Sequence, residues 1–256
     1  MHAVVGQLQV VHALLLRETR TRFGATQLGY LWALAQPMLW IGMFAVVYYA
    51  FGRMTPAGMS TIAFLTTGIV PFSLFRETAG RSMSAIDANR GLLFYPRVRP
   101  LDLVTARVVL EAVTQLCVLA ILMGGVALYE GPFVIDSVLD TLAGLALASG
   151  LGASLGLVCC GLSVFSSSVE RLFPALMRPM FWLSALFHPV ESVPKAFRDI
   201  LLLNPVTHAI ELVRDGWFPG YHARHTDALY PLTWIAVMLF FGLSLERVTR
   251  RRLELT

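Results

Sequence analysis

The amino-acid sequence predicts an all-α polytopic membrane protein: six transmembrane helices, an amphipathic interface helix before the first, and a re-entrant helical hairpin between the fifth and the sixth. The first observation behind this fold class is composition. Hydrophobic residues make up 56% of the 256 positions and charged residues only 14%, whereas a soluble domain carries about 25% charged residues. So few charges cannot cover a soluble surface, which excludes a secreted globular enzyme, a disordered chain and a nucleic-acid-binding domain.

The second observation is a series of long apolar segments. A hydrocarbon core about 30 Å thick needs roughly 20 apolar residues in helical conformation. The first segment contains no charged residue and is the clearest span, and Pro71 is expected to kink the second. The six expected spans are residues 31–51, 61–75, 103–129, 138–165, 172–190 and 228–245.

The third observation is the distribution of basic residues. With the six spans in these places, 15 of the 20 lysines and arginines lie on the side that holds both termini, and 5 lie on the other side. Basic residues accumulate on the cytoplasmic side of membrane proteins. We therefore expect a multi-pass protein with both termini in the cytoplasm, and the positive net charge does not require a nucleic-acid partner.

Residues 1–28 are expected to form a cytoplasmic amphipathic interface helix, followed by the six-helix transmembrane domain at 29–256. Apolar residues in the first segment recur at helical spacing, and the segment ends in a mixed-sign cluster that comprises Arg17, Glu18, Arg20 and Arg22. Such a helix can lie in the membrane interface and present its polar face to a partner protein. The alternative is an anchor whose arginines contact anionic lipid headgroups.

The cytoplasmic connection between the second and third spans is longer than a turn requires. Residues 82–91 are compatible with a helix that exposes Asp87, Asn89 and Arg90. Two prolines then impose extended backbone on residues 95–100 and display Arg97 and Arg99. Arginine pairs bind phosphate or carboxylate groups, and membrane topology alone accounts for them equally well.

Ionisable residues inside spans are costly and usually face an interior or one another. Arg107 and Glu111 are four residues apart and can pair on one helix face. Arg178 lies between Met177 and Pro179 and has no acidic residue near it in the sequence. We therefore expect Arg178 to face a water-filled cavity.

The segment 196–220, between the fifth and sixth spans, differs from the rest. Its two apolar pieces, 196–203 and 206–213, are each too short to cross a bilayer, and Asn204 and Pro205 separate them. We expect a periplasmic re-entrant hairpin, which is tolerated at membrane depth where it packs on protein or lines a wet cavity. The alternative is an outer loop with two surface helices.

The second piece of this hairpin has clear helix signals. Asn204 can cap it, and Pro205 suits its first position. His208, Glu211 and Arg214 follow at spacings that place them on one helix face. In a homodimer this face can meet its symmetry mate or line the exit of a channel, so we expect the hairpin to act as a mobile outer gate.

Sequence motifs for chemistry are weak. Lys195 is the only lysine and no phosphate-binding loop contains it, so this chain is not expected to hydrolyse nucleotide. Residues 152–156 match Gly-x-Ser-x-Gly around Ser154, but inside a span we expect a small-residue packing face, not a hydrolase nucleophile. The three cysteines are expected to be buried free thiols, and no spacing of potential ligands indicates a metal site.

Three stretches of the sequence resemble a known family. Residues 16–24 (LRETRTRFG) and 28–33 (LGYLWA) resemble the N-terminal signature of polysaccharide-export ABC transporter permeases, a signature that O-antigen and teichoic-acid exporters share. Two further stretches resemble the capsular polysaccharide branch, the KpsM-like permeases: 86–92 with 100–102 and 106–107, and 204–212 with 219–221. The resemblance covers essentially the whole chain.

The resemblance implies a half-transporter in the bacterial inner membrane. Two copies of this chain would assemble with two copies of a KpsT-like ABC ATPase subunit, which would bind ATP and Mg, while this chain would bind no cofactor and would not be an enzyme. The substrate would be a lipid-linked and often acidic capsular polysaccharide, moved from cytoplasm to periplasm, with periplasmic and outer-membrane export proteins as further partners. The alternatives are an O-antigen or teichoic-acid exporter permease and an intramembrane hydrolase.

The residues described above and the resemblance together give three sets of expected site residues. The contacts with the ATPase are expected from Arg17, Glu18, Arg20, Arg22, Ile86, Asp87, Asn89 and Arg90. The substrate path is expected to include Tyr30, Trp32, Arg97, Arg99 and Arg178. The outer gate is expected to include Asn204, Pro205, His208, Glu211 and Arg214.

Overall fold

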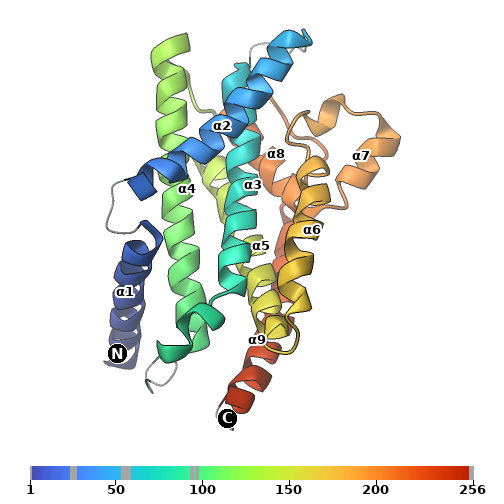
Figure 1. The fold of residues 1–256 in the computed structure, drawn as a ribbon. Coiled ribbons are helices and arrows are strands. Elements are labelled where there is room, and N and C mark those ends of the chain that lie inside the picture. Colours follow the sequence, from blue (N-terminus) through green and yellow to red (C-terminus); the bar gives the residue numbers. More distant parts are fainter. Residues whose placement is uncertain (1, 24–27, 53–58, 93–94, 96–97, 254–256) are drawn as a thin grey trace.

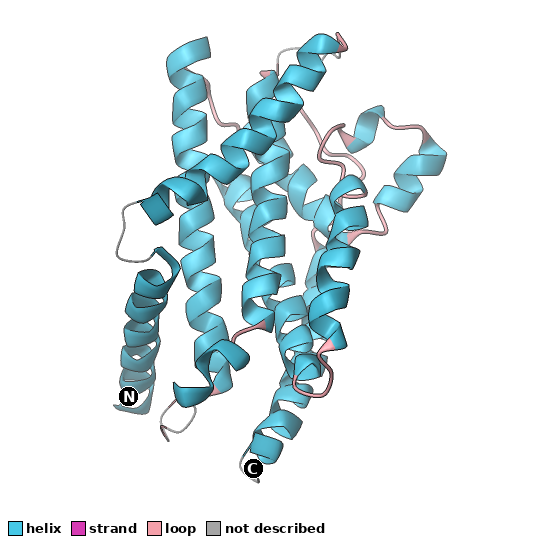
Figure 2. Ribbon diagram, viewed as in Figure 1, coloured by secondary structure: helices cyan, strands magenta, loops and turns pink. Residues whose placement is uncertain are grey.

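The computed structural model describes residues 2–23, 28–52, 59–92, 95 and 98–253. This part of the chain is all-helical, as predicted, and contains no strand (Figure 2). Its elements are α1 (His2–Phe23), α2 (Leu28–Ala50), α3 (Thr61–Met83), η1 (Asp87–Leu92), α4 (Pro100–Glu130), α5 (Val138–Ser163), α6 (Ser168–Trp182), η2 (Val190–Ser192), α7 (Lys195–Leu201), α8 (Pro205–Trp217) and α9 (Leu229–Leu253), where η1 and η2 are short 3₁₀ helices.

Helix α5 forms the centre of the bundle. It packs on α3, α8 and α9, and α3 in turn packs on α4 and α2. Figure 1 shows α2 crossing α3 and α4 obliquely, and α1 lying beside α4. The start of α1 and the end of α9 lie at the same end of the bundle (Figure 1), which we call the terminal end. An even number of membrane crossings requires this arrangement.

Three of the described helices are long and apolar enough to cross a membrane: Pro100–Glu130, Val138–Ser163 and Leu229–Thr249. They coincide with the third, fourth and sixth expected spans. Leu34–Ala50, within the first expected span, is a shorter apolar helix. The apolar pattern therefore located these helices correctly.

Two helices end at positions that the apolar pattern did not indicate. Helix α3 continues past residue 75 to Met83, and Arg76 and Glu77, which follow the apolar segment, form an ion pair with each other at 2.8 Å. Helix α6 ends at Trp182, so the expected span at 172–190 is too long. Beyond it Ala185 has a positive φ of 53°, and its carbonyl oxygen accepts a hydrogen bond from Arg214 in place of a helical N–H.

Small residues let α5 approach α3 closely. A Cβ atom on Gly152 would lie 2.5 Å from the carbonyl oxygen of Phe75, and one on Gly156 would collide with the Cβ of Ser82. Ser154 is fully buried, and its hydroxyl donates to the carbonyl of Leu151 in its own helix at 3.1 Å. The predicted packing role of residues 152–156 is confirmed, and the burial of Ser154 gives a substrate no access to its hydroxyl.

The three cysteines are free thiols, and their burial differs from the prediction. Cys160 is buried and Cys159 is partly buried, but Cys117 is exposed. It lies on a face of α4 that also exposes Val113 and Ile121. An apolar stretch can face lipid as well as protein, so the prediction that all three thiols are buried in the protein was wrong for Cys117.

The close approach of α5 and α3 gives a testable prediction. Gly156→Leu should destabilise the protein by about 1–3 kcal/mol or more, because the added side chain overpacks a backbone contact. Gly124→Leu is the matched control, since a Cβ at Gly124 meets no atom within 4 Å. Thermal unfolding in detergent, followed by size-exclusion chromatography, measures both; equal midpoints would contradict the packing argument.

Candidate functional site

Helix α1 is fastened to the rest of its own chain at the terminal end. Its Leu14 is buried in an apolar cluster with residues of α4 and the segment before η1. Two polar contacts flank this cluster: the amide of Gln7 donates to Asp102 at 2.5 Å, and Glu18 forms an ion pair with Arg107 at 2.5 Å. Part of the polar face of α1 is therefore occupied by contacts with α4 of the same chain.

The two expected parts of the ATPase-contact surface touch each other. The guanidinium of Arg17 donates to the side-chain oxygen of Asn89 at 2.6 Å, and the amide of Asn89 donates to the carbonyl of Ala85 at 3.0 Å. Asn89 is consequently buried, so the expectation that it is exposed was wrong. Ile86 is also buried, because it packs in the same apolar cluster as α1.

The remaining members of this set differ in accessibility. Arg20 is exposed, Glu18 and Asp87 are half-buried, and the side chains of Arg22 and Arg90 lie outside the described part of the structure. The expected helix at 82–91 is split, because α3 ends at Met83 and the 3₁₀ helix η1 begins at Asp87. Of the described charged residues in this set, Arg17 and Arg20 are exposed, and Arg20 has no contact with η1 that would occupy its side chain.

The charges inside the third span have partners on other helices. Arg107 contacts Glu18 of α1 and also donates to the carbonyl of Arg81 at 2.6 Å and to Ser84 at 3.0 Å. Glu111 is fully buried and lies 3.0 Å from the guanidinium of Arg81. These ion pairs join α1, α3 and α4, whereas the sequence suggested a pair within one helix.

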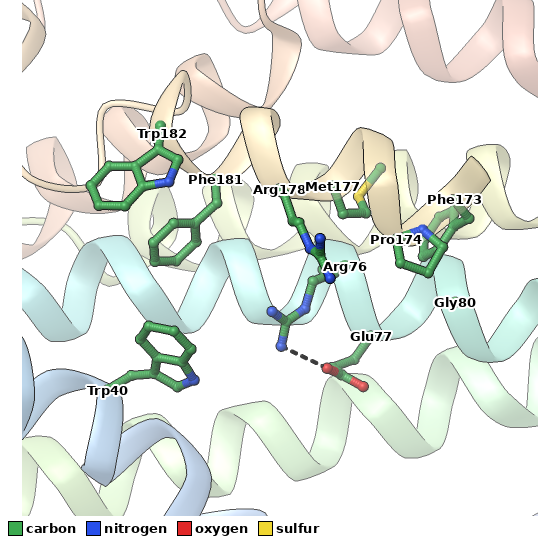
Figure 3. A pocket seen from close by; sticks show the side chains of 10 residues that line it. All are labelled: Trp40, Arg76, Glu77, Gly80, Phe173, Pro174, Met177, Arg178, Phe181 and Trp182. Atoms are coloured by element: carbon green, nitrogen blue, oxygen red, sulfur yellow. Dashed lines mark hydrogen bonds and ion pairs between the residues drawn. The ribbon is translucent and has the colours of Figure 1, made fainter. Parts of the chain in front are cut away.

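A groove of about 510 Å³ lies between α3, α6 and the side chain of Trp40 from α2 (Figure 3). Arg178 lines it, as expected for a residue that faces a cavity, and is exposed. Across the groove α3 contributes Arg76, which pairs with Glu77 at 2.8 Å. The other lining residues are Gly80, Phe173, Pro174, Met177, Phe181 and Trp182.

The expected substrate-path residues do not lie together in the structure. Of these residues only Arg178 lines the groove. Trp32 is exposed on α2, and Arg99 is exposed at the start of α4, where its backbone N–H donates to Asp102 at 2.8 Å. Arg97 and the side chain of Tyr30 lie outside the described part of the structure.

Sequence reasoning missed Arg76, Glu77 and Trp40 as site residues. It assigned Arg76 to a cytoplasmic connection, because the apolar run ends at residue 75, and it counted Trp40 only as part of a span. The sequence feature that could have indicated these residues is the adjacent Arg76-Glu77 pair, which directly follows the apolar run ending at residue 75. Such a pair is inexpensive to keep inside a helix near the membrane, because each charge has a partner.

The segment after η2 forms two helices, as expected, and the cap is as predicted. The side-chain oxygen of Asn204 accepts from the backbone N–H of Val206 at 3.0 Å, and Pro205 is the first residue of α8. His208 accepts from the N–H of Asp227 at Nδ1, at 3.0 Å. Its Nε2 therefore carries the proton and donates to the carbonyl of Leu202 at 2.9 Å.

The face shared by Glu211 and Arg214 is turned into the chain itself. Both side chains are fully buried and pair at 2.7 Å. Arg214 also donates to the carbonyls of Ala185 and Leu186 and stacks over the ring of Phe64, 4.1 Å from its centroid. The expectation that this face meets a symmetry mate or lines an exit was wrong, because the loop after α6 supplies acceptors that bury it.

The hydroxyl of Tyr221 completes this network by donating to Glu211. By contrast, the neighbouring helix α7 is largely exposed and shows Phe197 and Ile200 at its surface. Helix α8 is thus fixed in the bundle, and α7 projects from it, as Figure 1 shows.

The buried pair gives a second prediction. Arg214→Met should cost about 3–5 kcal/mol, because Glu211 is left as an uncompensated buried charge. The double variant Glu211→Gln with Arg214→Met should be more stable than Arg214→Met alone. Arg224→Gln, at an exposed position, is the control. Thermal unfolding in detergent compares the three variants with the wild type; a double variant less stable than Arg214→Met would contradict the prediction.

Comparison with known proteins now identifies the family. Residues 9–218 match the ABC-2 type transporter family. The chain is 34% identical over 254 residues to the polysialic acid transport protein KpsM of Escherichia coli, covering 98% of this chain and 96% of the relative. It is 26% identical over 245 residues to the capsule polysaccharide export inner-membrane protein CtrC of Neisseria meningitidis, covering 95% and 92%.

A further relative is the capsule polysaccharide export inner-membrane protein BexB of Haemophilus influenzae, at 29% identity over 253 residues, or 97% and 94% of the two chains. These alignments run from the region of α1 to that of α9. Because the family match spans most of the chain and the relatives align along nearly all of it, the chain belongs to the ABC-2 type transporter family.

Proposed function

We propose that this chain is the membrane permease subunit of an ATP-driven exporter that moves lipid-linked capsular polysaccharide from the cytoplasm to the periplasm. The observation that carries the proposal is the near full-length similarity to proteins named for polysialic acid transport and capsule polysaccharide export. The alignments cover 92–96% of the length of these relatives.

The proposed assembly is a homodimer with two copies of an ABC ATPase subunit, which binds ATP and Mg. In each copy α2, α3, α4, α5, α6 and α9 cross the bacterial inner membrane, and both termini lie in the cytoplasm. The common location of the start of α1 and the end of α9 supports this topology. The excess of basic residues on that side agrees with it.

The groove supports a transport path. An arginine such as Arg178, exposed on a membrane helix, is costly unless water or an anion lies beside it. Many weak contacts suit a polymer better than one deep pocket, since the substrate must also leave. Arg178 and Arg76 are therefore proposed as donors along the path of the anionic, lipid-linked substrate.

We propose that residues 196–220 form the outer gate, in which one helix is fixed and the other moves. Helix α8 serves as the fixed part, because Glu211 and Arg214 hold it in the bundle. Helix α7 is the part that moves, because it has few contacts with the other helices and exposes apolar side chains. Asn204, which caps α8, stands at the hinge between them.

The ATPase is proposed to dock on the combined surface of α1 and η1. Arg20→Glu should lower the amount of co-purified ATPase about tenfold or more, because a reversed charge meets a like charge in the partner. Arg224→Glu is the control: Arg224 is also exposed but precedes the start of α9, at the end of that helix opposite to the terminal end. Equal ATPase yield from both variants would contradict the docking surface.

The function itself is tested by reconstitution. The permease and its ATPase, co-purified and placed in proteoliposomes, should hydrolyse ATP faster when lipid-linked capsular polysaccharide is present, and should move the polymer across the bilayer. Lipid-linked O-antigen and teichoic acid are parallel arms of the experiment. Stimulation and transport with one of those polymers, and none with capsular polysaccharide, would overturn the assignment in favour of that exporter class.

A further inference from the structure

The groove between α3 and α6 combines two arginines with apolar walls. In Figure 3 the side chains of Arg76 and Arg178 enter the same space from opposite helices. Trp40, Phe181 and Trp182 lie at one end of this space, and Phe173 and Pro174 lie at the other. The arginines therefore occupy the middle of an otherwise apolar groove.

The charge of this groove is not balanced by the protein. Arg178 has no hydrogen bond or ion pair within the described part of the chain, and Arg76 pairs only with its sequence neighbour Glu77. The formal charge of the three side chains together is +1. The opposite face of α6 exposes Leu172 and Leu176, which places this helix against lipid. An unpaired guanidinium in such surroundings favours an anionic partner.

The geometry also indicates the kind of anion. Guanidinium groups bind phosphate oxygens bidentately, and a formal charge of +1 matches a singly charged phosphodiester. The aromatic side chains of Trp40 and Trp182 suit the boundary between a lipid headgroup and acyl chains. A cavity of about 510 Å³ is in the range of small-molecule sites. A free sugar carboxylate would use the arginines but not the apolar ends of the groove.

We propose that this groove binds the phosphodiester headgroup of a membrane lipid, with Arg76 and Arg178 as its ligands and with Trp40 and Trp182 against the adjoining acyl region. Two lipids offer this chemistry: the phosphate at the lipid end of the exported glycan, and an ordinary anionic phospholipid. In the first case the site would hold the leading end of the substrate and would rest on the proposed function. In the second it would be a lipid site independent of that function.

The test uses the permease–ATPase complex in nanodiscs and measures quenching of tryptophan fluorescence by lipids with brominated acyl chains. Brominated phosphatidylglycerol should quench more strongly than brominated phosphatidylcholine. Arg178→Gln and Arg76→Gln should each raise about tenfold the fraction of phosphatidylglycerol that gives half of this additional quenching, and Arg178→Lys should keep part of the wild-type affinity. Arg171→Gln, at an exposed position on α6 that does not line the groove, should bind as the wild type does.

A second arm identifies the lipid. Unlabelled lipid-linked glycan is added as a competitor, and the same glycan with its lipid removed is added in parallel. Competition by the intact form only assigns the site to the substrate's lipid end, and competition by neither, with arginine-dependent quenching, assigns it to bulk phospholipid. Equal competition by the delipidated glycan would overturn the proposal, and so would quenching that Arg76→Gln and Arg178→Gln leave unchanged.

The outcome for this site is separable from that of the proposed function. If the wild-type complex shows no glycan-stimulated ATP hydrolysis but binds phosphatidylglycerol through both arginines, the proposed function fails and the lipid site stands. If the complex transports glycan but the two variants bind lipid normally, the function stands and the lipid site fails.

Discussion

A charged side chain inside an apolar helical bundle needs a partner, because its desolvation costs several kcal/mol and no water is present to solvate it there. In this chain the partners come from other parts of the fold. Glu18 reaches Arg107, Arg81 reaches Glu111, and Arg214 joins the loop after α6 as well as Glu211. The first two ion pairs, and the bonds from Arg214 to the carbonyls of that loop, each fix the relative position of two elements, and much of the arrangement follows from these contacts.

Close packing supplies the complementary constraint. Gly152 and Gly156 bring α5 against the backbone of α3, and van der Waals contact of this kind, not the hydrophobic effect, drives helix association in lipid. Helix α3, held in this way from one side, presents Arg76 and Glu77 on its other side to α6. The position of the groove therefore depends on the contact between α5 and α3.

The sequence predicted the elements governed by local rules. The third, fourth and sixth apolar spans, the cap at Asn204 and the small-residue face of α5 each depend on a single stretch of sequence, and the structure has them. Contacts between distant segments were not predictable. The partners of Arg107 and Arg214, and the burial of Asn89, depend on how helices dock, which periodicity does not encode. Arg178 was placed correctly in a cavity, but its neighbour Arg76 was not foreseen.

The buried network around Arg214 also bears on how the chain enters the membrane during synthesis. Its ion-pair partner, Glu211, lies three residues earlier, and the carbonyls of Ala185 and Leu186 precede both in the sequence. When Arg214 is added to the growing chain, the residues that carry all of these acceptors have already been synthesised. Helix α8 is therefore synthesised with its two charges able to neutralise each other within one helical turn. Only Tyr221 arrives later, so the nascent helix can be accommodated before α9 is translated.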